Sequence, residues 1–152
     1  MSLTQPTKKM SKSDPNPKSR VLITDSHEAI FSKINGAVTD SQDGISYDRE
    51  NRPGWSNLIE IMCHLDGGSK YASCEEVAHD WNSMSKKAAK SMVASSIETH
   101  LAPVREKYHE LIGKDLQQTG QLMQSALEGA SKAGSVAAIT IKQVRKAVGL
   151  WA

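Results

Sequence analysis

The sequence predicts an all-α protein: a helical bundle preceded by a flexible basic loop and a short extended segment. Apolar residues recur at helical spacing through much of the chain after residue 25. Aromatic residues make up only 5% of the 152 residues and include a single Phe, so the core must consist mainly of Leu, Ile, Val, Met and Ala. That composition favours helices packed on helices over a β-sandwich. The length suits one domain with a leader, and we expect the division to fall between residues 1–24 and residues 25–152.

The leader is basic and rich in proline. Three prolines within residues 1–20 prevent a helix there and bias the residues before them toward extended backbone. Residues 8–16 carry three lysines and two serines without an apolar run, and residues 21–23 suit a short extended segment. We therefore expect a mobile loop that contributes little to the core. Deletion of residues 1–20 should then leave the melting transition almost unchanged.

A first helix is expected from Asp25 to about Val38. Asp25 has the character of an N-cap, and Glu28 follows it at the spacing of a capping box. Residues 39–56 then form a long polar loop, in which Thr, Ser, Asp, Asn, Pro and Gly dominate. For Trp55, at the end of this loop, we expect local packing, and contact with a further domain is the alternative.

Two shorter helices should follow the loop. Ser56 or Asn57 is expected to cap the first, and the Asp-Gly-Gly sequence at residues 66–68 should end it, because glycine accepts a left-handed cap. A Ser/Glu capping box at residues 73–76 precedes a short helix over residues 74–81. The inward face of this short helix should hold Val77, Ala78 and Trp81.

Two long helices complete the prediction. The first runs from about residue 84 to residue 112, and Pro103 should kink it, because proline removes a backbone donor and clashes with the previous turn. Gly113 should end it. The second runs from about residue 116 or 121 to residue 148, where Gly149 stops it. The expected apolar stripe of the first long helix is Ala88, Met92, Ile97, Leu101, Val104, Tyr108 and Leu111.

Residues 9–13 place two lysines and two serines around one methionine. Lysine is a strongly hydrated point charge on a flexible stem, which suits phosphate oxygens whose positions change during a reaction. The alternative is a solvated basic loop. A pattern of only five residues, taken alone, would favour this alternative.

These five letters, KMSKS, resemble the second signature motif of the class I aminoacyl-tRNA synthetases. Further stretches follow in order and at matching spacing, and together they resemble the C-terminal part of a tryptophanyl-tRNA synthetase of bacterial type. Tyrosyl-tRNA synthetases share the lysine loop, but the stretches between residues 45 and 58 argue against them. The matching stretches are Ile23–Ser26, Ala37–Ser41, Ile45–Asp48, Asn51–Gly54, Ser56–Leu58, Leu101–Arg105 and Val144–Leu150.

The resemblance implies part of a tryptophan–tRNA ligase, which activates tryptophan with ATP, accompanied by Mg²⁺, and transfers it to tRNA(Trp). It implies catalytic roles on the ATP phosphates for Lys9 and Lys12. It implies further ATP contacts for Met10, Ser11 and Ser13. It also implies that residues 1–24 are the tail of the catalytic domain, that the helical part binds the anticodon region, and that the full-length enzyme is a homodimer.

Other parts of such an enzyme have no counterpart in the sequence. The HIGH motif, the glycine-rich start of the parallel sheet and the residues of the indole pocket are absent, and none of the five histidines has a matching context. We therefore expect a fragment that alone neither forms tryptophanyl-adenylate nor binds ATP tightly. A stand-alone, non-catalytic helical tRNA-binding module is the alternative, and a purely structural helical protein is a third hypothesis.

Two further groups of cations lie on predicted helical faces. One comprises the three lysines of residues 86–90, and the other comprises Lys142, Arg145 and Lys146. Contact with tRNA phosphates is the functional interpretation, and a solvated face is the alternative for both. The terminal group would also stabilise the negative end of the helix dipole. With the resemblance, the terminal group becomes a candidate tRNA contact.

Composition narrows the remaining possibilities. A net charge of +2 means that any RNA contact must come from local patches. Cys63 and Cys74 lack the close cysteine pair of tetrahedral zinc sites, so we expect reduced thiols and no protein-bound structural metal. No apolar run approaches the ~20 residues of a membrane span. The bacterial-type pattern fits a bacterial cytoplasm or a mitochondrial matrix, of which we favour the second.

Overall fold

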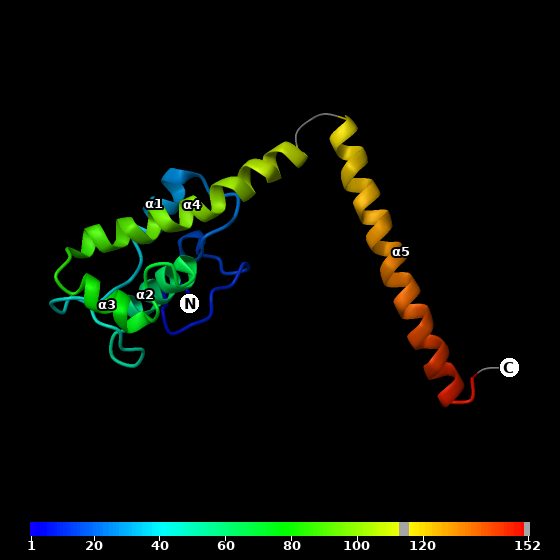
Figure 1. Ribbon diagram of the computed structural model, residues 1–152, viewed down its shortest axis with the longest axis horizontal. Helices are drawn as coiled ribbons and strands as arrows, with labels where there is room; N and C mark the ends of the chain where they lie inside the picture. The colour runs from blue at the N-terminus through cyan, green and yellow to red at the C-terminus, as the bar shows by residue number, and fades with distance from the viewer. Residues whose placement is uncertain (113–115, 151–152) are drawn as a thin grey trace. The chain divides into compact units, whose positions relative to one another are not determined.

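The computed structural model describes residues 1–112 and 116–150. The regular elements of these residues are all helices and include no strand, in agreement with the predicted all-α class (Figure 1). The chain forms two compact units, residues 1–105 and residues 106–152. The helices are η1 (Pro17–Ser19, a 3-10 turn), α1 (His27–Asn35), α2 (Pro53–Asp66), α3 (Cys74–Trp81), α4 (Lys86–Ile112) and α5 (Leu116–Ala147).

Helix α1 begins with Ser26 as its N-cap, so the prediction of Asp25 was wrong. The Ser26 hydroxyl accepts a hydrogen bond from the Ala29 N–H at 3.2 Å, which satisfies a donor that the first turn leaves free. The Asp25 carboxylate is used elsewhere. It accepts from the Leu22 N–H at 2.8 Å and pairs with the Lys33 ammonium at 2.6 Å.

The end of α1 is held by Lys90. The helix ends at Asn35, earlier than predicted, with Gly36 as C-cap. The Lys90 ammonium donates to the carbonyl oxygens of Ala37 at 2.7 Å and Asn35 at 3.3 Å, and it lies 5.9 Å from the centre of the Trp55 ring. Burial, aided by a neighbouring lysine, lowers the pKa of Lys90. Lys90 thus packs against the end of α1. It fits neither of the two interpretations given for the lysines of residues 86–90, a solvated face and a phosphate contact.

Helix α2 begins at Pro53, so the predicted caps Ser56 and Asn57 were wrong. Proline suits this first position because the N–H that it lacks would have no helical partner there. Ser56 and Asn57 are buried within the first two turns, and Trp55 is fully buried, which confirms its local packing. The left-handed backbone of Gly67 (φ 61°) ends the helix as predicted.

Helix α3 has the predicted capping residue and inward face. The Ser73 hydroxyl accepts from the Glu76 N–H at 3.3 Å. The Glu76 carboxylate accepts in return from the N–H of Ala72 at 2.8 Å, one residue before the N-cap. The predicted inward residues Val77, Ala78 and Trp81 are all buried.

Helix α4 has about the predicted extent, but its buried face is shifted. It continues through Pro103 as one helix. Ala88 is exposed and Met92 only half-buried, while Val104 and Tyr108 are 49% and 39% exposed. The prediction failed there because the face that packs lies one residue further along the helix. The buried residues of α4 are Ala89, Val93, Ala94 and Ile97.

Helix α5 ends at Ala147, and Gly149, the predicted stop, follows with a left-handed backbone (φ 72°). The Leu150 N–H donates to the Arg145 carbonyl at 2.9 Å, and the Gly149 N–H donates to the Lys146 carbonyl at 3.3 Å. This is the hydrogen-bond pair of a Schellman motif. Gly113, which was expected to end the preceding helix, lies outside the described residues.

The leader is docked onto the first unit, contrary to the expectation that it contributes little to the core. Leu3 is only 1% exposed. Its N–H donates to the Ser19 carbonyl at 2.9 Å, and its own carbonyl accepts from the Val38 N–H at 2.8 Å. The Asn57 side chain accepts from the Met1 amine at 2.8 Å and donates to the Met1 carbonyl at 3.2 Å. Leu3, its backbone hydrogen bonds and the contacts between Met1 and Asn57 therefore fix the leader despite the polar residues around it.

Candidate functional site

The candidate phosphate loop, Lys9–Ser13, lies on the surface of the first unit. Lys9 and Lys12 are exposed, and their ammonium groups form no hydrogen bond or ion pair with the other residues that the structure describes. Two unneutralised positive charges within one short loop attract anions. The structure therefore places both predicted lysines where a phosphate group can reach them.

The tip of this loop is a tight turn. The Asp14 N–H donates to the Ser11 carbonyl at 3.3 Å, and the Ser13 N–H donates to the Ser11 hydroxyl at 3.4 Å. The hydroxyls of Ser11 and Ser13 are themselves 3.0 Å apart. Lys12 stands at the apex of the turn, between the two hydroxyls.

Met10 anchors the start of the turn, although the sequence suggested that no apolar contact would do so. Its side chain is half-buried and packs against the hydrophobic core. It lines an almost wholly apolar pocket of about 240 Å³. The other lining residues are Leu3, Val21, Ile23, Ile61, Leu65, Ile97, His100 and Leu101.

Arg20 holds the other side of the turn, and the sequence analysis missed it because no motif marks it. Its Nη1 donates to the Asp14 carbonyl at 2.6 Å and lies 3.4 Å from the Asn16 carbonyl. The Asn16 side chain caps η1 by accepting from the Lys18 N–H at 3.0 Å, and the Ser19 hydroxyl donates to the Asn16 carbonyl at 2.7 Å. Residues 14–20 thus form an ordered base for the turn.

The Asn51–Gly54 stretch has a clear structural role. Arg52 is only 5% exposed, and its guanidinium donates twice to the Asp40 carboxylate, at 2.7 and 3.0 Å. Further donors reach the Ser46 hydroxyl at 2.9 Å and the Gly44 carbonyl at 3.0 Å. The hydrogen bonds from Arg52 hold the pKa of Asp40 below its usual range, and the carboxylate raises the pKa of Arg52.

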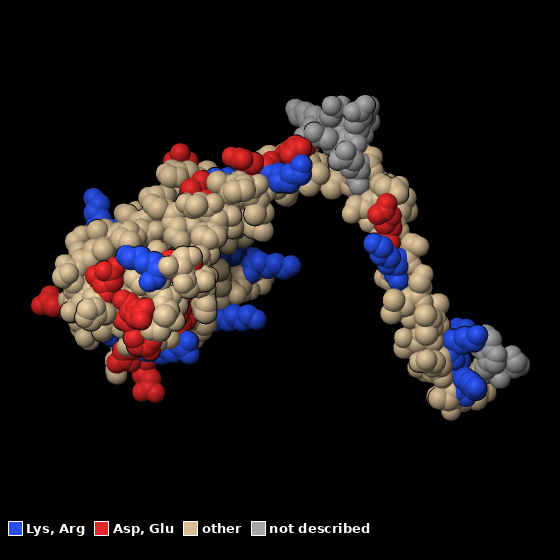
Figure 2. All heavy atoms as spheres, viewed as in Figure 1, with Lys and Arg blue, Asp and Glu red and all other residues tan. Residues whose placement is uncertain are grey.

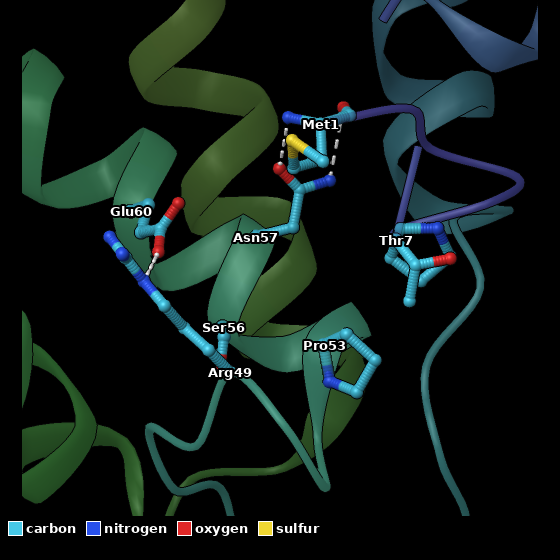
Figure 3. A pocket seen from close by; sticks show the side chains of 8 residues that line it. Met1, Thr7, Arg49, Pro53, Ser56, Asn57 and Glu60 are labelled. Atoms are coloured by element: carbon cyan, nitrogen blue, oxygen red, sulfur yellow. Dashed lines mark hydrogen bonds and ion pairs between the residues drawn. The ribbon is translucent and has the colours of Figure 1, made fainter. Parts of the chain in front are cut away.

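A separate pocket of about 490 Å³ lies where the leader meets α2 (Figure 3). Arg49 Nε donates to Glu60 at 2.6 Å on one side of it, and Asn57 holds Met1 on another. No residue of the Lys9–Ser13 loop lines this pocket. Its lining residues are Met1, Pro6, Thr7, Arg49, Pro53, Ser56, Asn57 and Glu60.

The terminal cations Lys142, Arg145 and Lys146 are exposed on α5, in the second unit. Figure 2 shows Lys and Arg side chains gathered near the C-terminal end of this helix. Arg145 and Lys146 stand in its last turn, where cations also stabilise the negative end of the helix dipole. The structure thus groups the loop residues in one unit and the terminal cations in the other.

The cysteines are free and half-buried. Burial, followed by the contact with the Cys63 thiol, raises the pKa of Cys74 to about 11, which keeps this thiol protonated and weakly nucleophilic. Within residues 1–112 and 116–150, no group of three or more His, Cys, Asp or Glu side chains is arranged to hold a metal ion. The helices of the same residues include none with the length and hydropathy of a bilayer span.

Comparison with known proteins places this geometry in context. The tryptophan–tRNA ligase of Bacillus anthracis is 39% identical over 150 residues, which are 99% of this chain and 43% of the relative. The mitochondrial tryptophan–tRNA ligase of Caenorhabditis elegans is 33% identical over 148 residues, 97% of this chain and 38% of the relative. The chain therefore spans less than half the length of these relatives.

A solved structure and a family model agree with these similarities. The crystal structure of tryptophanyl-tRNA synthetase from Mycoplasma pneumoniae matches all of this chain and 45% of its own, with a TM-score of 0.73 and 24% identity, which shows the shared fold. The model of the family described as tRNA synthetases class I (W and Y) matches residues 1–102. Since this match covers about two thirds of the sequence, the chain belongs to the class I tRNA synthetases for tryptophan and tyrosine.

Proposed function

We propose that this chain is part of a tryptophan–tRNA ligase, in which it supplies the KMSKS loop and the helical tRNA-binding region. The observation that carries the proposal is the turn at Ser11–Asp14, which presents Lys12 beside Lys9 with both charges unpaired among the described residues. The relatives named tryptophan–tRNA ligase support the choice of tryptophan over tyrosine. In this scheme, residues 1–24 complete the catalytic domain and residues 25–152 face the anticodon region of tRNA(Trp).

The proposed chemistry requires positive charge that can follow a moving phosphate. The tryptophan carboxylate attacks the α-phosphorus of ATP, which is bound with Mg²⁺, and pyrophosphate leaves. Negative charge then grows on the phosphoryl oxygens and the leaving group. Lys12 and Lys9 stabilise that charge more in the transition state than in the ground state, because the charge is largest there. The Ser11 and Ser13 hydroxyls donate hydrogen bonds to phosphate oxygens, and the Met10 backbone lies near the adenine.

The proposed partners follow from the same scheme. The complete enzyme binds tryptophan, ATP and tRNA(Trp), and it is a homodimer. The chain acts in a bacterial cytoplasm or a mitochondrial matrix, and the similarity to the mitochondrial ligase of C. elegans supports the matrix as an option.

A chimera tests the proposal directly. The chain would replace the part of the B. anthracis ligase that it matches, and tryptophan-dependent ATP–pyrophosphate exchange would be measured. We expect exchange by the chimera and none by the 152-residue chain alone. Lys12→Ala should lower kcat of the chimera about 100- to 1,000-fold, as the loss of other transition-state donors does. Lys18→Ala removes an exposed cation of the same segment and serves as the matched control.

Two results would contradict the proposal. One is exchange that is equally fast in the Lys12→Ala and unmodified chimeras. The other is a folded chimera without exchange activity. If the folded chimera were inactive but the chain still bound tRNA(Trp) in preference to a non-cognate tRNA, the second candidate function would be favoured. That candidate is a non-catalytic tRNA-binding module, and the exposed cation group on α5 is the observation that supports it.

A further inference from the structure

We propose that Arg20 is a positioning residue for the phosphate loop: its guanidinium holds the Asp14 carbonyl and thereby fixes the turn that presents Lys12. The inference rests on the proposed function, because it assigns a role within that same site. Arg20 is not part of the KMSKS letters and does not lie at the tip.

The contact is direct and short. Nη1 of Arg20 lies 2.6 Å from the Asp14 carbonyl oxygen and 3.4 Å from that of Asn16. Arg20 is half-buried, and its Nε is a buried atom with no hydrogen-bond partner among the described residues. The side chain is therefore fixed against the protein while one end of its guanidinium reaches the loop.

Asp14 is the residue at which this brace affects the turn. Its N–H closes the turn by donating to the Ser11 carbonyl at 3.3 Å, and its carboxylate accepts from the Asn16 N–H at 2.8 Å. A movement of the Asp14 backbone therefore breaks the hydrogen bond that closes the turn around Lys12. Arg20 is the side chain that donates to the Asp14 carbonyl.

The two ends of the turn are thus held by different physical means. Met10 packs into the apolar pocket at the start of the turn, and Arg20 holds the carbonyl of Asp14 at its end. Only Ser11, Lys12 and Ser13 lie between these two anchors. A group held close to its productive position before substrate arrives loses less entropy on reaction, so the brace should favour productive contact between Lys12 and the ATP phosphates.

Limited proteolysis tests the brace on the 152-residue chain, without any assumption about activity. Trypsin cleaves after Lys12 only when the turn opens. In Arg20→Met, which keeps a long side chain but removes the donors, cleavage between Lys12 and Ser13 should accelerate about fivefold or more, the effect of losing one hydrogen bond. Arg20→Lys should show a smaller acceleration.

Lys18→Met is the matched control, and it should be cleaved after Lys12 as fast as the unmodified chain. Cleavage after Lys87 on α4 should not change in any variant, which separates a loosened turn from general unfolding.

The chimera then tests the catalytic consequence. Arg20→Met should lower kcat/KM for ATP about 10- to 100-fold, the scale of a misplaced catalytic group, while KM for tryptophan stays unchanged. Arg20→Lys should recover part of the loss, because one donor is restored. Substitution of a merely structural residue would change the kinetic constants for ATP and for tryptophan alike, or would change neither.

The outcomes separate the two proposals. Equal cleavage after Lys12 in Arg20→Met and in the unmodified chain would overturn the positioning role, whether or not the ligase proposal stands. Faster cleavage with an unchanged kcat/KM for ATP would also overturn it. An unmodified chimera that folds but shows no exchange would overturn the ligase proposal, while the proteolysis result would still decide whether Arg20 braces the turn.

Discussion

The Asp40 carboxylate and the Arg52 guanidinium form a two-pronged ion pair, with oxygen–nitrogen distances of 2.7 and 3.0 Å. Asp40 lies at the start of the polar connection between α1 and α2, and Arg52 lies at its end, one residue before α2 begins. The remaining Arg52 donors bind the Ser46 hydroxyl and the Gly44 carbonyl within the same connection. One arginine thus closes a long polar segment that has no helix or strand of its own.

Removal of the Asp40 carboxylate should destabilise the first unit strongly. Asp40→Ala leaves the nearly buried Arg52 charge without its partner, and breaking one side of such a pair costs about 3–5 kcal/mol. Urea unfolding followed by circular dichroism would measure the loss. Asp43→Ala, an exposed carboxylate in the same connection, is the matched control and should change the free energy of unfolding by less than about 0.5 kcal/mol. If the two variants were equally stable, the ion pair would not hold the connection.

The same pair predicts how stability depends on pH. The hydrogen bonds from Arg52 lower the pKa of Asp40 below its ordinary 3.8, and those from Arg105 lower the pKa of Glu98 in the same way. The unfolded chain then binds more protons in acid than the folded chain does. The contribution of these two carboxylates to the free energy of unfolding is fully present above their pKa in the unfolded chain. It is lost as pH falls through their pKa in the folded chain. The free energy of unfolding should therefore be nearly flat from neutral pH down to about 5 and fall below about pH 4.

A variant isolates the Asp40 contribution to this pH dependence. In Asp40→Asn, the side chain cannot ionise, so the slope of stability against pH below about 4 should be shallower than in the unmodified chain. Asp43→Asn should keep the unmodified slope. If the free energy of unfolding fell with the same slope below about pH 4 in Asp40→Asn and in the unmodified chain, other carboxylates would be responsible for the acid dependence.

Local contacts explain which helix boundaries the sequence predicted. The Ser73–Glu76 capping box was predicted correctly because the hydroxyl and the N–H that it binds lie three residues apart. At Asp25 and Ser26, two good capping residues are adjacent, and the choice between them is decided by the ion pair of Asp25 with Lys33. Nothing in the pattern of residues 25–28 reveals that competition.

Contacts between distant residues explain what the sequence could not predict. Leu3 is buried because Ser19 and Val38, far along the chain, offer it backbone hydrogen bonds. In the site, the KMSKS letters identified the candidate loop, but they gave no sign that Met10 packs against the core or that Arg20 holds Asp14. Those roles depend on the folded surroundings rather than on spacing.

Gly54 is required where α2 passes the segment after α1. A Cβ at this position would lie 2.3 Å from the Val38 carbonyl oxygen and 2.9 Å from the Thr39 Cα, both backbone atoms that cannot rotate away. Gly54→Ala should therefore destabilise the chain by about 1–3 kcal/mol or more, as overpacking does. Thermal unfolding would measure this effect.

Gly129 on α5 supplies the control for that substitution. A Cβ there meets nothing within 4 Å, and alanine is a better helix former than glycine by about 1 kcal/mol. Gly129→Ala should therefore keep or increase the helix signal in circular dichroism. If Gly54→Ala were as well tolerated as Gly129→Ala, the close approach of α2 to Val38 would not exist in solution.

Leu3→Ala should show that the leader is part of the fold. Leu3 is 1% exposed, and truncation of a buried leucine costs about 2–5 kcal/mol through lost burial and a residual cavity. Leu22→Ala, at a leucine that is 39% exposed in the neighbouring segment, should cost much less. Urea unfolding of both variants would make the comparison. An unchanged midpoint in Leu3→Ala would restore the view of the leader as an independent, mobile segment.

The proposed function requires that the α5 cations contribute to tRNA binding through phosphate contacts. Each phosphate neutralised by Lys or Arg steepens the dependence of log affinity on log salt concentration by about 0.7–0.9. Arg145→Ala with Lys146→Ala should therefore reduce the slope for tRNA(Trp) by about 1–2, because two exposed charges are lost. Filter binding between 50 and about 200 mM salt spans the range in which such contacts dominate. Lys132→Ala, an exposed cation nearer the middle of the same helix, is the matched control and should leave the slope unchanged. An unaltered slope in the double variant, with unaltered helix content, would mean that these cations do not contact RNA phosphates and that their role is confined to the end of α5.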